Sequence, residues 1–265
     1  MEAARLEAEV LLAAAAGWTR TRILAYPERP VPESARRRFE GWLGRRLRER
    51  VPVQYLTRRQ EFWSLDLYVD ERVLIPRPET ECLVEEVLRA ASPRPETWAD
   101  VGTGSGAVAL ALASGRADCR VLALDVSLDA LAVAKLNRRR HPEPGSRVSL
   151  VGSDLLEALR PGGPALDRIA ANLPYMTEAE RRGLAPEVAG HEPAGALVAG
   201  NDAAAIIRRL LPQAARHLRP GGSLHLEIAP GLRDEVAALM KSAGFSSIKV
   251  RADALGLPRV VSGFL

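Results

Sequence analysis

The stretch Asp100-Val-Gly-Thr-Gly-Ser-Gly106 follows a short apolar run and leads directly into a segment with helical periodicity. Gly102, Gly104 and Gly106 let the backbone turn tightly and approach a ligand without a Cβ clash. The helix that follows offers free amide donors at its N-terminus. Turns of this kind bind nucleotide-like ligands in doubly wound sheets, so the stretch predicts such a site after the first strand of the sheet.

Short apolar runs alternate with helical segments from residue 97 to residue 265. This alternation predicts an α/β fold, with an open and mostly parallel seven-stranded sheet covered by helices on both faces. The predicted strands are 98–101, 120–124, 147–151, 168–172, 223–228, 246–250 and 259–264. The predicted helices are 105–115, 127–140, 202–218 and 233–243.

The N-terminal part of the chain has a different pattern. Apolar residues at helical spacing predict three helices, the first ended by Gly17, the second near 21–26 and the third capped by Ser34 and running to about Arg50. The alternating, aromatic-rich stretch that comes next predicts extended strands, and a proline-flanked helix over 79–91 follows it. We therefore expect a small helical bundle over 1–60, a β-hairpin linker over 61–75 and the α/β domain over 76–265.

Composition excludes several classes of protein. The chain has 265 residues, 47% hydrophobic and 26% charged, which is enough apolar surface for a folded core. Two cysteines and four scattered histidines predict neither a disulfide scaffold nor a metal site. No apolar run approaches the roughly 20 residues that span a bilayer, and no secretory signal is evident. We expect a cytoplasmic protein with no membrane contact.

The charge is unevenly distributed along the chain. The formal net charge is +4, but residues 1–60 hold 13 arginines and seven acidic residues, a net of +6, and the remainder carries −2. A basic end of this kind is typical of a solvated, arginine-rich helix face, and it can also steer contact with RNA or the ribosome. Both interpretations stay open.

Two further positions bear on the cofactor. Asp125, at the end of the second predicted strand, can accept hydrogen bonds from two ribose hydroxyls, of NAD or of S-adenosylmethionine (SAM) alike. The spacing of the glycines after Asp100 is typical of SAM, although a GxGxxA dinucleotide pattern also fits. Asp154 and Leu155 are predicted beside an adenine. The predicted cofactor-binding residues are Gly102, Thr103, Gly104, Ser105, Gly106, Asp125, Asp154, Leu155 and Asn172.

Asn172-Leu-Pro-Tyr175 comes directly after the fourth predicted strand. Its groups suit the methylation of an amide or aromatic amine nitrogen. The nitrogen of an amide or aromatic amine is a poor nucleophile because its lone pair is delocalised. Acceptors that hold both N–H hydrogens favour a pyramidal nitrogen whose lone pair faces an electrophilic methyl. Asn172, Pro174 and Tyr175 are the predicted catalytic residues. The predicted substrate-binding residues are Asn172, Leu173, Pro174, Tyr175 and Arg77.

With this motif the chain resembles the release-factor glutamine methyltransferases (HemK/PrmC type) over nearly its whole length. Pro52-Val-Gln-Tyr55, Leu74-Ile-Pro-Arg-Pro-Glu-Thr-Glu81, the segment 187–200 and Asp253-Ala-Leu-Gly-Leu-Pro-Arg259 are similar to that family's motifs. The resemblance implies SAM-dependent methylation of the glutamine in the Gly-Gly-Gln motif of bacterial peptide-chain release factors, which modulates translation termination. It also implies a helical substrate-recognition domain joined by a hairpin to a seven-stranded, Rossmann-like SAM-dependent methyltransferase domain.

The chain departs from the family pattern at three positions. Leu173 stands where a first proline is usual, Arg58 replaces a linker glycine, and Ala229 replaces a glycine after Glu227-Ile228. Asn-Leu-Pro-Tyr also resembles the motif of ribosomal-RNA adenine dimethyltransferases. The alternative is therefore an rRNA or DNA adenine N6-methyltransferase, and an NAD-dependent oxidoreductase and an RNA-binding module are the alternatives from other classes.

Overall fold

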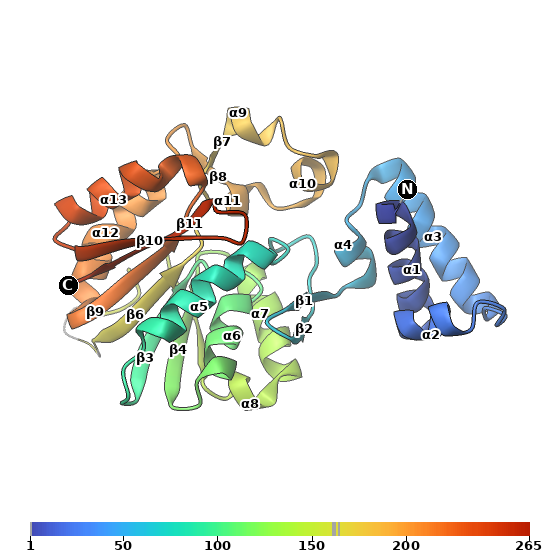
Figure 1. Ribbon diagram of the computed structural model, residues 1–265, viewed down its shortest axis with the longest axis horizontal. Helices are drawn as coiled ribbons and strands as arrows, with labels where there is room; N and C mark the ends of the chain where they lie inside the picture. Colours follow the sequence, from blue (N-terminus) through green and yellow to red (C-terminus); the bar gives the residue numbers. More distant parts are fainter. Residues whose placement is uncertain (1, 161–162, 164) are drawn as a thin grey trace.

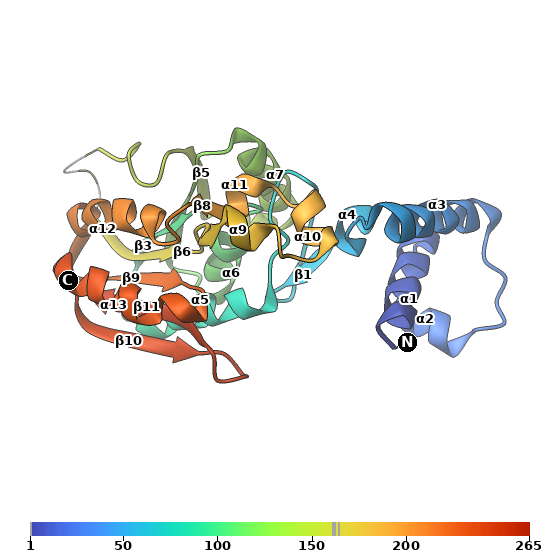
Figure 2. The same cartoon turned by 90° about the horizontal axis from the view of Figure 1, so that it is seen from above.

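The computed structural model describes residues 2–160, 163 and 165–265. The N-terminal helices α1 to α4 lie beside a larger region built around one sheet (Figure 1). Seen from above, the two regions are joined through α4, β1 and the chain that follows (Figure 2).

Seven strands form the main sheet, in the order β10-β11-β9-β6-β3-β4-β5. The five strands from β9 to β5 run parallel, and β11 is antiparallel to both of its neighbours. The strands are β3 (Glu96–Val101), β4 (Cys119–Asp125), β5 (Val148–Gly152), β6 (Leu166–Ala171), β9 (Leu218–Glu227), β10 (Ser246–Ala252) and β11 (Pro258–Phe264). The predicted seven-stranded α/β sheet is confirmed, and the carboxyl ends of its parallel strands meet at one edge.

Helices cover both faces of this sheet. Trp98 of β3 packs in a core with α5 and α6, whereas Ala99 and Val101 pack on the opposite face with α12 and α13. The helices of this region are α5 (Glu81–Ala90), α6 (Ala107–Gly115), α7 (Leu128–Arg140), α8 (Pro142–Gly145), α12 (Ala205–His217) and α13 (Arg233–Ser242), with short 3-10 helices η1 (Pro78–Thr80) and η2 (Pro230–Leu232).

An excursion of short elements lies between β6 and α12, where no element was predicted. β7 and β8 pair in parallel, with three short helices between them (Figure 1). The elements are β7 (Met176–Thr177), α9 (Glu178–Arg181), α10 (Pro186–His191), α11 (Ala194–Leu197) and β8 (Val198–Gly200). α9 begins with a capping box between Thr177 and Glu180. Short helices of four to six residues leave little periodicity in the sequence to detect.

The N-terminal region contains the three predicted helices and one more. They are α1 (Glu2–Ala16), α2 (Arg20–Ala25), α3 (Glu33–Glu49) and the unpredicted α4 (Val53–Thr57). The prediction that Ser34 caps the third helix is wrong. α3 already begins at Glu33, after Pro32, and no side chain caps it. The fixed φ of Pro32 presets the entry, so no side-chain cap is needed one residue later.

The linker forms a shorter hairpin than the sequence predicts. β1 (Gln60–Phe62) pairs with β2 (Leu65–Leu67), and the chain then runs on without a strand partner. Its Tyr68 exchanges backbone hydrogen bonds of 2.7 and 2.9 Å with the Asn137 side chain of α7. A third core joins Leu11 of α1 and Tyr55 of α4 to α7. This shared core holds the helical region against the sheet region; the division at residues 60 and 75 stays a prediction.

Candidate functional site

The glycine turn after β3 takes the conformation that its sequence predicts. Gly102, Gly104 and Gly106 all have positive φ, at 77°, 54° and 81°. The amides of Gly102 and Thr103 donate to the Leu124 carbonyl at 2.8 and 2.9 Å, which ties the turn to β4. A Cβ on Gly104 would meet no atom within 4 Å, so this side of the turn is open. A ligand can therefore approach the backbone here.

A cavity of about 400 Å³ lies at the carboxyl edge of the sheet, in front of this turn. It collects most of the predicted site residues, which come from four different strand ends. Those that line it are Gly102, Gly104, Asp125, Asp154, Leu155, Asn172, Leu173 and Pro174. The volume falls in the range of about 300–1,000 Å³ that small-molecule sites occupy.

Asp125 is the last residue of β4 and stands at the wall of this cavity. Its Oδ2 accepts from the Gly104 amide at 2.8 Å and its Oδ1 from the Ser127 amide at 2.9 Å. Burial raises the pKa of Asp125. An ionised carboxylate offers about four acceptor positions, so two remain for hydroxyl groups of a ligand.

Three predicted cofactor-binding residues do not line the cavity. Thr103 is buried and donates through its hydroxyl to Asp100 at 2.6 Å. Ser105 is buried and its carbonyl accepts from Asn137, while a Cβ on Gly106 would lie 3.2 Å from Ala134. The structure thus gives these three residues contacts that shape the turn, and their predicted contact with a cofactor stays a prediction.

Asp100 supports the glycine turn from behind, although sequence reasoning used it only as a spacing marker. Its side chain is 1% exposed and accepts from the Thr103 hydroxyl and from the Ala109 amide at 3.0 Å. Burial raises the pKa of Asp100 to about 7, against the lowering effect of these two hydrogen bonds. A carboxyl two residues before the first glycine was the signal that could have identified it.

Asn172 leaves the carboxyl end of β6 and lines the cavity. Its Nδ2 donates to the Thr80 hydroxyl of η1 at 3.2 Å. The Leu173 side chain is buried, and its Cδ2 would lie 3.2 Å from a Cβ on Gly102. Tyr175 lines a small adjoining cavity together with Leu74. Burial raises the pKa of Tyr175.

Glu227 is a second residue that sequence reasoning missed. It ends β9, is 4% exposed, and lies beside Asn172 and Thr80. Burial raises the pKa of Glu227 to about 7, and these two neighbours offset only part of that shift. A carboxyl group at the end of a predicted central strand was the available signal.

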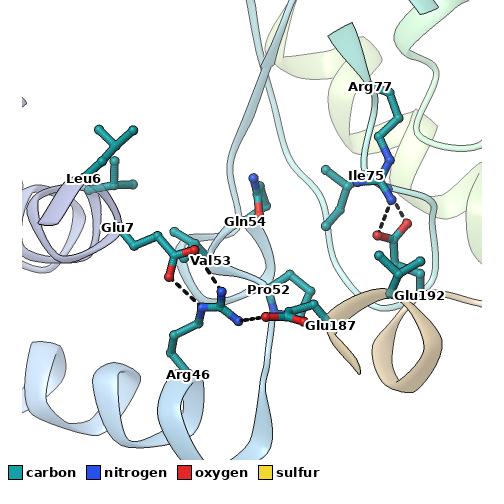
Figure 3. Close-up of a pocket in the computed structure, with 12 residues that line it drawn as sticks. Leu6, Glu7, Arg46, Pro52, Val53, Gln54, Ile75, Arg77, Glu187 and Glu192 are labelled. Atoms are coloured by element: carbon teal, nitrogen blue, oxygen red, sulfur yellow. Dashed lines mark hydrogen bonds and ion pairs between the residues drawn. The ribbon is translucent and has the colours of Figure 1, made fainter. Parts of the chain in front are cut away.

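Arg77, a predicted substrate-binding residue, lies away from the larger cavity. It forms an ion pair with Glu192, and both residues line a second cavity of about 270 Å³ next to the N-terminal helices (Figure 3). In the same view Arg46 of α3 bridges Glu7 of α1 and Glu187 of α10, at 2.8 and 2.7 Å. Arg77 therefore has a carboxylate partner already, and its predicted contact with a substrate stays a prediction.

Two of the three departures from the family pattern have a structural explanation. Arg58 ends α4 in the left-handed conformation, with φ 56°, which glycine adopts without strain. Ala229 has φ −66° and ψ 142°, where any residue fits. Within the described ranges, no group of three or more His, Cys, Asp or Glu could hold a metal ion, and no helix is long and apolar enough to cross a membrane.

Comparison with known proteins assigns the chain to a family. The PrmC N-terminal domain model matches residues 1–57, and the methyltransferase small domain model matches residues 78–188. A Koribacter versatilis protein named release factor glutamine methyltransferase is 40% identical, covering 98% of this chain and 90% of its own. Proteins of the same name from Geobacter sulfurreducens and Moorella thermoacetica are 38% and 45% identical, covering 99% and 92% of this chain and 90% and 85% of their own.

Solved structures agree on the fold. A Pyrococcus furiosus methyltransferase has a TM-score of 0.55 and 21% identity, covering 76% of this chain and 88% of that one. A Thermus thermophilus 16S rRNA N2 G1207 methyltransferase, in complex with AdoMet and guanosine, has a TM-score of 0.56 and 18% identity, covering 78% of this chain and 49% of that one. Together with the identity to its relatives over nearly the full length, these findings show that the chain belongs to the release factor glutamine methyltransferase family.

Proposed function

We propose that this chain transfers a methyl group from SAM to the side-chain nitrogen of the glutamine in the Gly-Gly-Gln motif of bacterial peptide-chain release factors, and so modulates translation termination. The relatives that share its full length carry the name of this activity. The observation that carries the chemistry is the placement of Asn172 on the same cavity as the glycine turn and Asp125.

The residues at this cavity fit SAM. The open side of Gly104 accommodates close approach of a ligand to the backbone, and Asp125 keeps acceptor positions for two ribose hydroxyls. Asp154 and Leu155 also line the cavity, and we expect them beside the adenine. When bound, SAM supplies an electrophilic methyl group on a sulfonium ion.

Asn172 and the backbone of Leu173 and Pro174 orient the acceptor amide. The Asn172 carbonyl oxygen and one backbone carbonyl accept its two N–H hydrogens, which aims the nitrogen lone pair at the methyl. Leucine has the same backbone carbonyl as the usual proline. The Leu173 side chain is buried against the glycine turn and so does not fill the cavity for the acceptor amide. Tyr175 packs beside the planar amide. The nitrogen loses its proton as the new bond forms, so no ionised base is needed before attack.

Adenine methylation of rRNA or DNA is not favoured, since the matching relatives are named for a protein substrate. The test is incubation with labelled SAM and either a release factor or ribosomal RNA. Label in the release factor is expected. Label in RNA alone would replace this proposal with the alternative.

A contact with the ribosome or RNA through residues 1–60 is a separate proposal. Arg36 and Arg37 of α3 are 61% and 71% exposed, and their ion pairs reach only Glu33 and Glu40 on the same helix. Exposed pairs of this kind leave both arginines accessible to a polyanion. Four other arginines of the region pair with carboxylates outside it, so only part of its net +6 is available. RNA binding that weakens steeply with salt would support this contact. A protein that acts on release factors is expected in the cytoplasm.

A further inference from the structure

Glu227 is a buried carboxyl group to which the proposed methyl transfer assigns no role. It ends β9 at the carboxyl edge of the sheet and is 4% exposed. Its Oε2 is fully buried and has no hydrogen-bond partner among the described residues. Leaving a buried carboxyl oxygen unpaired costs free energy, so such a group calls for an explanation.

The strand register places Glu227 beside Asn172. β6 and β9 run parallel with Ala171 opposite Leu226, so the next residue of each strand, Asn172 and Glu227, are also neighbours. Ala171 and Leu226 face the α12–α13 core. Because side chains alternate along a strand, Asn172 and Glu227 face the other side, where η1 brings Thr80. Thr80 itself is 4% exposed.

The chemistry of the Asn172, Thr80 and Glu227 side chains determines which of them donates a hydrogen bond and which accepts. Asn172 Nδ2 donates to the Thr80 oxygen at 3.2 Å, which leaves the Thr80 hydroxyl proton free to point elsewhere. The Glu227 carboxyl is the neighbour of Asn172 across the strand register, and both Thr80 and Asn172 favour its ionised form by lowering its pKa. An ionised carboxylate only accepts, so it fixes Thr80 as its donor and the Asn172 NH₂ as the donor to Thr80.

We propose that Glu227 is a positioning residue for Asn172: acting through Thr80, its carboxylate keeps the Asn172 NH₂ turned inward and the Asn172 carbonyl oxygen turned toward the acceptor amide. The proposal rests on the proposed methyl transfer, for which only the carbonyl oxygen is a useful acceptor. Without the carboxylate, the Asn172 amide could rotate by half a turn and present NH₂ to an NH₂ group. Turnover would fall although the fold and the cofactor site stay intact.

Protonation of Glu227 should have the same effect as removing its charge. A protonated carboxyl can donate to Thr80, whose hydroxyl can then donate to a rotated Asn172. The charged and titratable groups that face Glu227 are Arg259 from β11 and Glu79 from η1, and Tyr175 stands across from it. Arg259 favours the ionised carboxylate and Glu79 opposes it. The ionised form gains as the pH rises through about 7.

The test compares Glu227→Gln, Thr80→Val and the double variant in methyl transfer to a release factor. Each single variant should lower kcat about tenfold, with SAM affinity within about threefold of wild type, and the double variant should be no slower than the slower single one. Wild-type kcat should rise with pH through about 7, and Glu227→Gln should lose that rise. The matched control is Glu96→Gln, a buried carboxyl at the opposite edge of the sheet, which should leave kcat unchanged.

Unchanged kcat and an unchanged pH profile in Glu227→Gln would overturn the proposal, as would single effects that multiply in the double variant. If the wild type methylates no release factor, the proposed function fails, and NMR of the Asn172 side-chain amide decides the positioning role separately. Its resonances should shift with a midpoint near pH 7 in the wild type and not in Glu227→Gln. A pH-independent amide in the wild type would refute it.

Discussion

The two edges of the main sheet both carry buried carboxyl groups, but the two sets differ in their ion pairs and in the direction of their pKa shifts. At the amino edge, Glu96 accepts from Ser92 and Trp98 and pairs with Arg168 at 3.3 Å. Burial alone would raise the pKa of Glu96, but these hydrogen bonds and the arginine outweigh it and lower the pKa. The neighbouring Asp167 is held by Arg94 and Arg219.

At the carboxyl edge, none of the buried Asp100 and Glu227 and the half-buried Asp125 has an ion pair within the part of the chain that the structure describes. Burial raises the pKa of all three. Three arginines pair with the carboxylates at the amino edge, whereas the nearest cation at the carboxyl edge, Arg259, forms no ion pair with Glu227 among the described residues. The amino edge is therefore built for stability, and the carboxyl edge keeps acceptor oxygens available for ligands and side-chain positioning.

At neutral pH, the largest effect on stability should come from breaking the paired edge. Arg168→Met removes the charge that faces Glu96 in a site where both side chains are at most 5% exposed. The free energy of unfolding should fall by about 3 kcal/mol, because the buried carboxylate loses its nearer counter-charge and keeps only the Arg219 guanidinium at 3.9 Å. Denaturant titration measures it. Adding Glu96→Gln should recover part of the loss; turnover per folded molecule should not change in either variant.

Asn172→Ala removes the acceptor at the carboxyl edge. Turnover should fall by about 10²–10³, the usual cost of losing a transition-state hydrogen bond, while SAM affinity stays within about tenfold. Steady-state kinetics and equilibrium SAM titration check the two parts. Equal turnover in the variant would remove Asn172 from the chemistry.

The pH dependence of stability should differ in sign between the edges. The folded-state pKa of Asp100 is raised to about 7, so its stabilising contribution is complete below about pH 4 and is lost as the pH rises to 7. The unfolding free energy of wild type minus Asp100→Asn should fall by about 4 kcal/mol over that window.

Glu96 supplies the matched comparison at the other edge. Its pKa is lowered, so its contribution is complete above about pH 4.5 and is lost as the pH falls further. Between about pH 4.5 and pH 7, the difference in unfolding free energy between wild type and Glu96→Gln should therefore stay constant. Over the same range the difference between wild type and Asp100→Asn should fall. Parallel curves for the two variants would show that the edges do not differ.

Asp125→Asn tests whether the open carboxylates bind ligand. The amide cannot accept from two hydroxyls while also bonding the Gly104 and Ser127 amides, so SAM affinity should weaken about tenfold. Turnover at saturating SAM should change less. Unaltered SAM affinity would place the ribose elsewhere.

The smallest expected effect on stability comes from a residue outside the main sheet, Arg58 at the end of α4, where the backbone conformation matters most. Arg58→Gly relieves a left-handed C-cap and should raise the free energy of unfolding by about 0.5–1 kcal/mol, less any contribution from the exposed Arg58–Glu71 pair. Arg58→Ala keeps the strain and loses the pair, so it should not stabilise. Thermal unfolding of both variants checks the sign.

The sequence predicted the fold of the sheet region well because its signals are local. Each strand run, helical period and the glycine turn is encoded by residues close together in the sequence. All seven strands of the main sheet were predicted. Missed elements such as α4 and α9 are too short to show a period. Asn172, Asp125 and the glycines were identified because their motifs are contiguous.

What the sequence could not show depends on contacts between distant segments. Glu227 becomes part of the site only through its register with β6 and its closeness to Thr80, which lies far from it in the chain. The Arg77–Glu192 ion pair is likewise invisible without the structure. Contiguous motifs in the sequence identified the residues predicted to act in methyl transfer. Only the packing of distant segments shows which other side chains contact them.

The most direct test locates the methyl group. A release factor is incubated with SAM and either wild-type enzyme or Asn172→Ala, and its peptides are analysed by mass spectrometry. We predict one added methyl on the side-chain nitrogen of the glutamine in Gly-Gly-Gln with the wild type, and little or none in the same time with the variant. An unmodified glutamine alongside methylated ribosomal RNA would contradict the account.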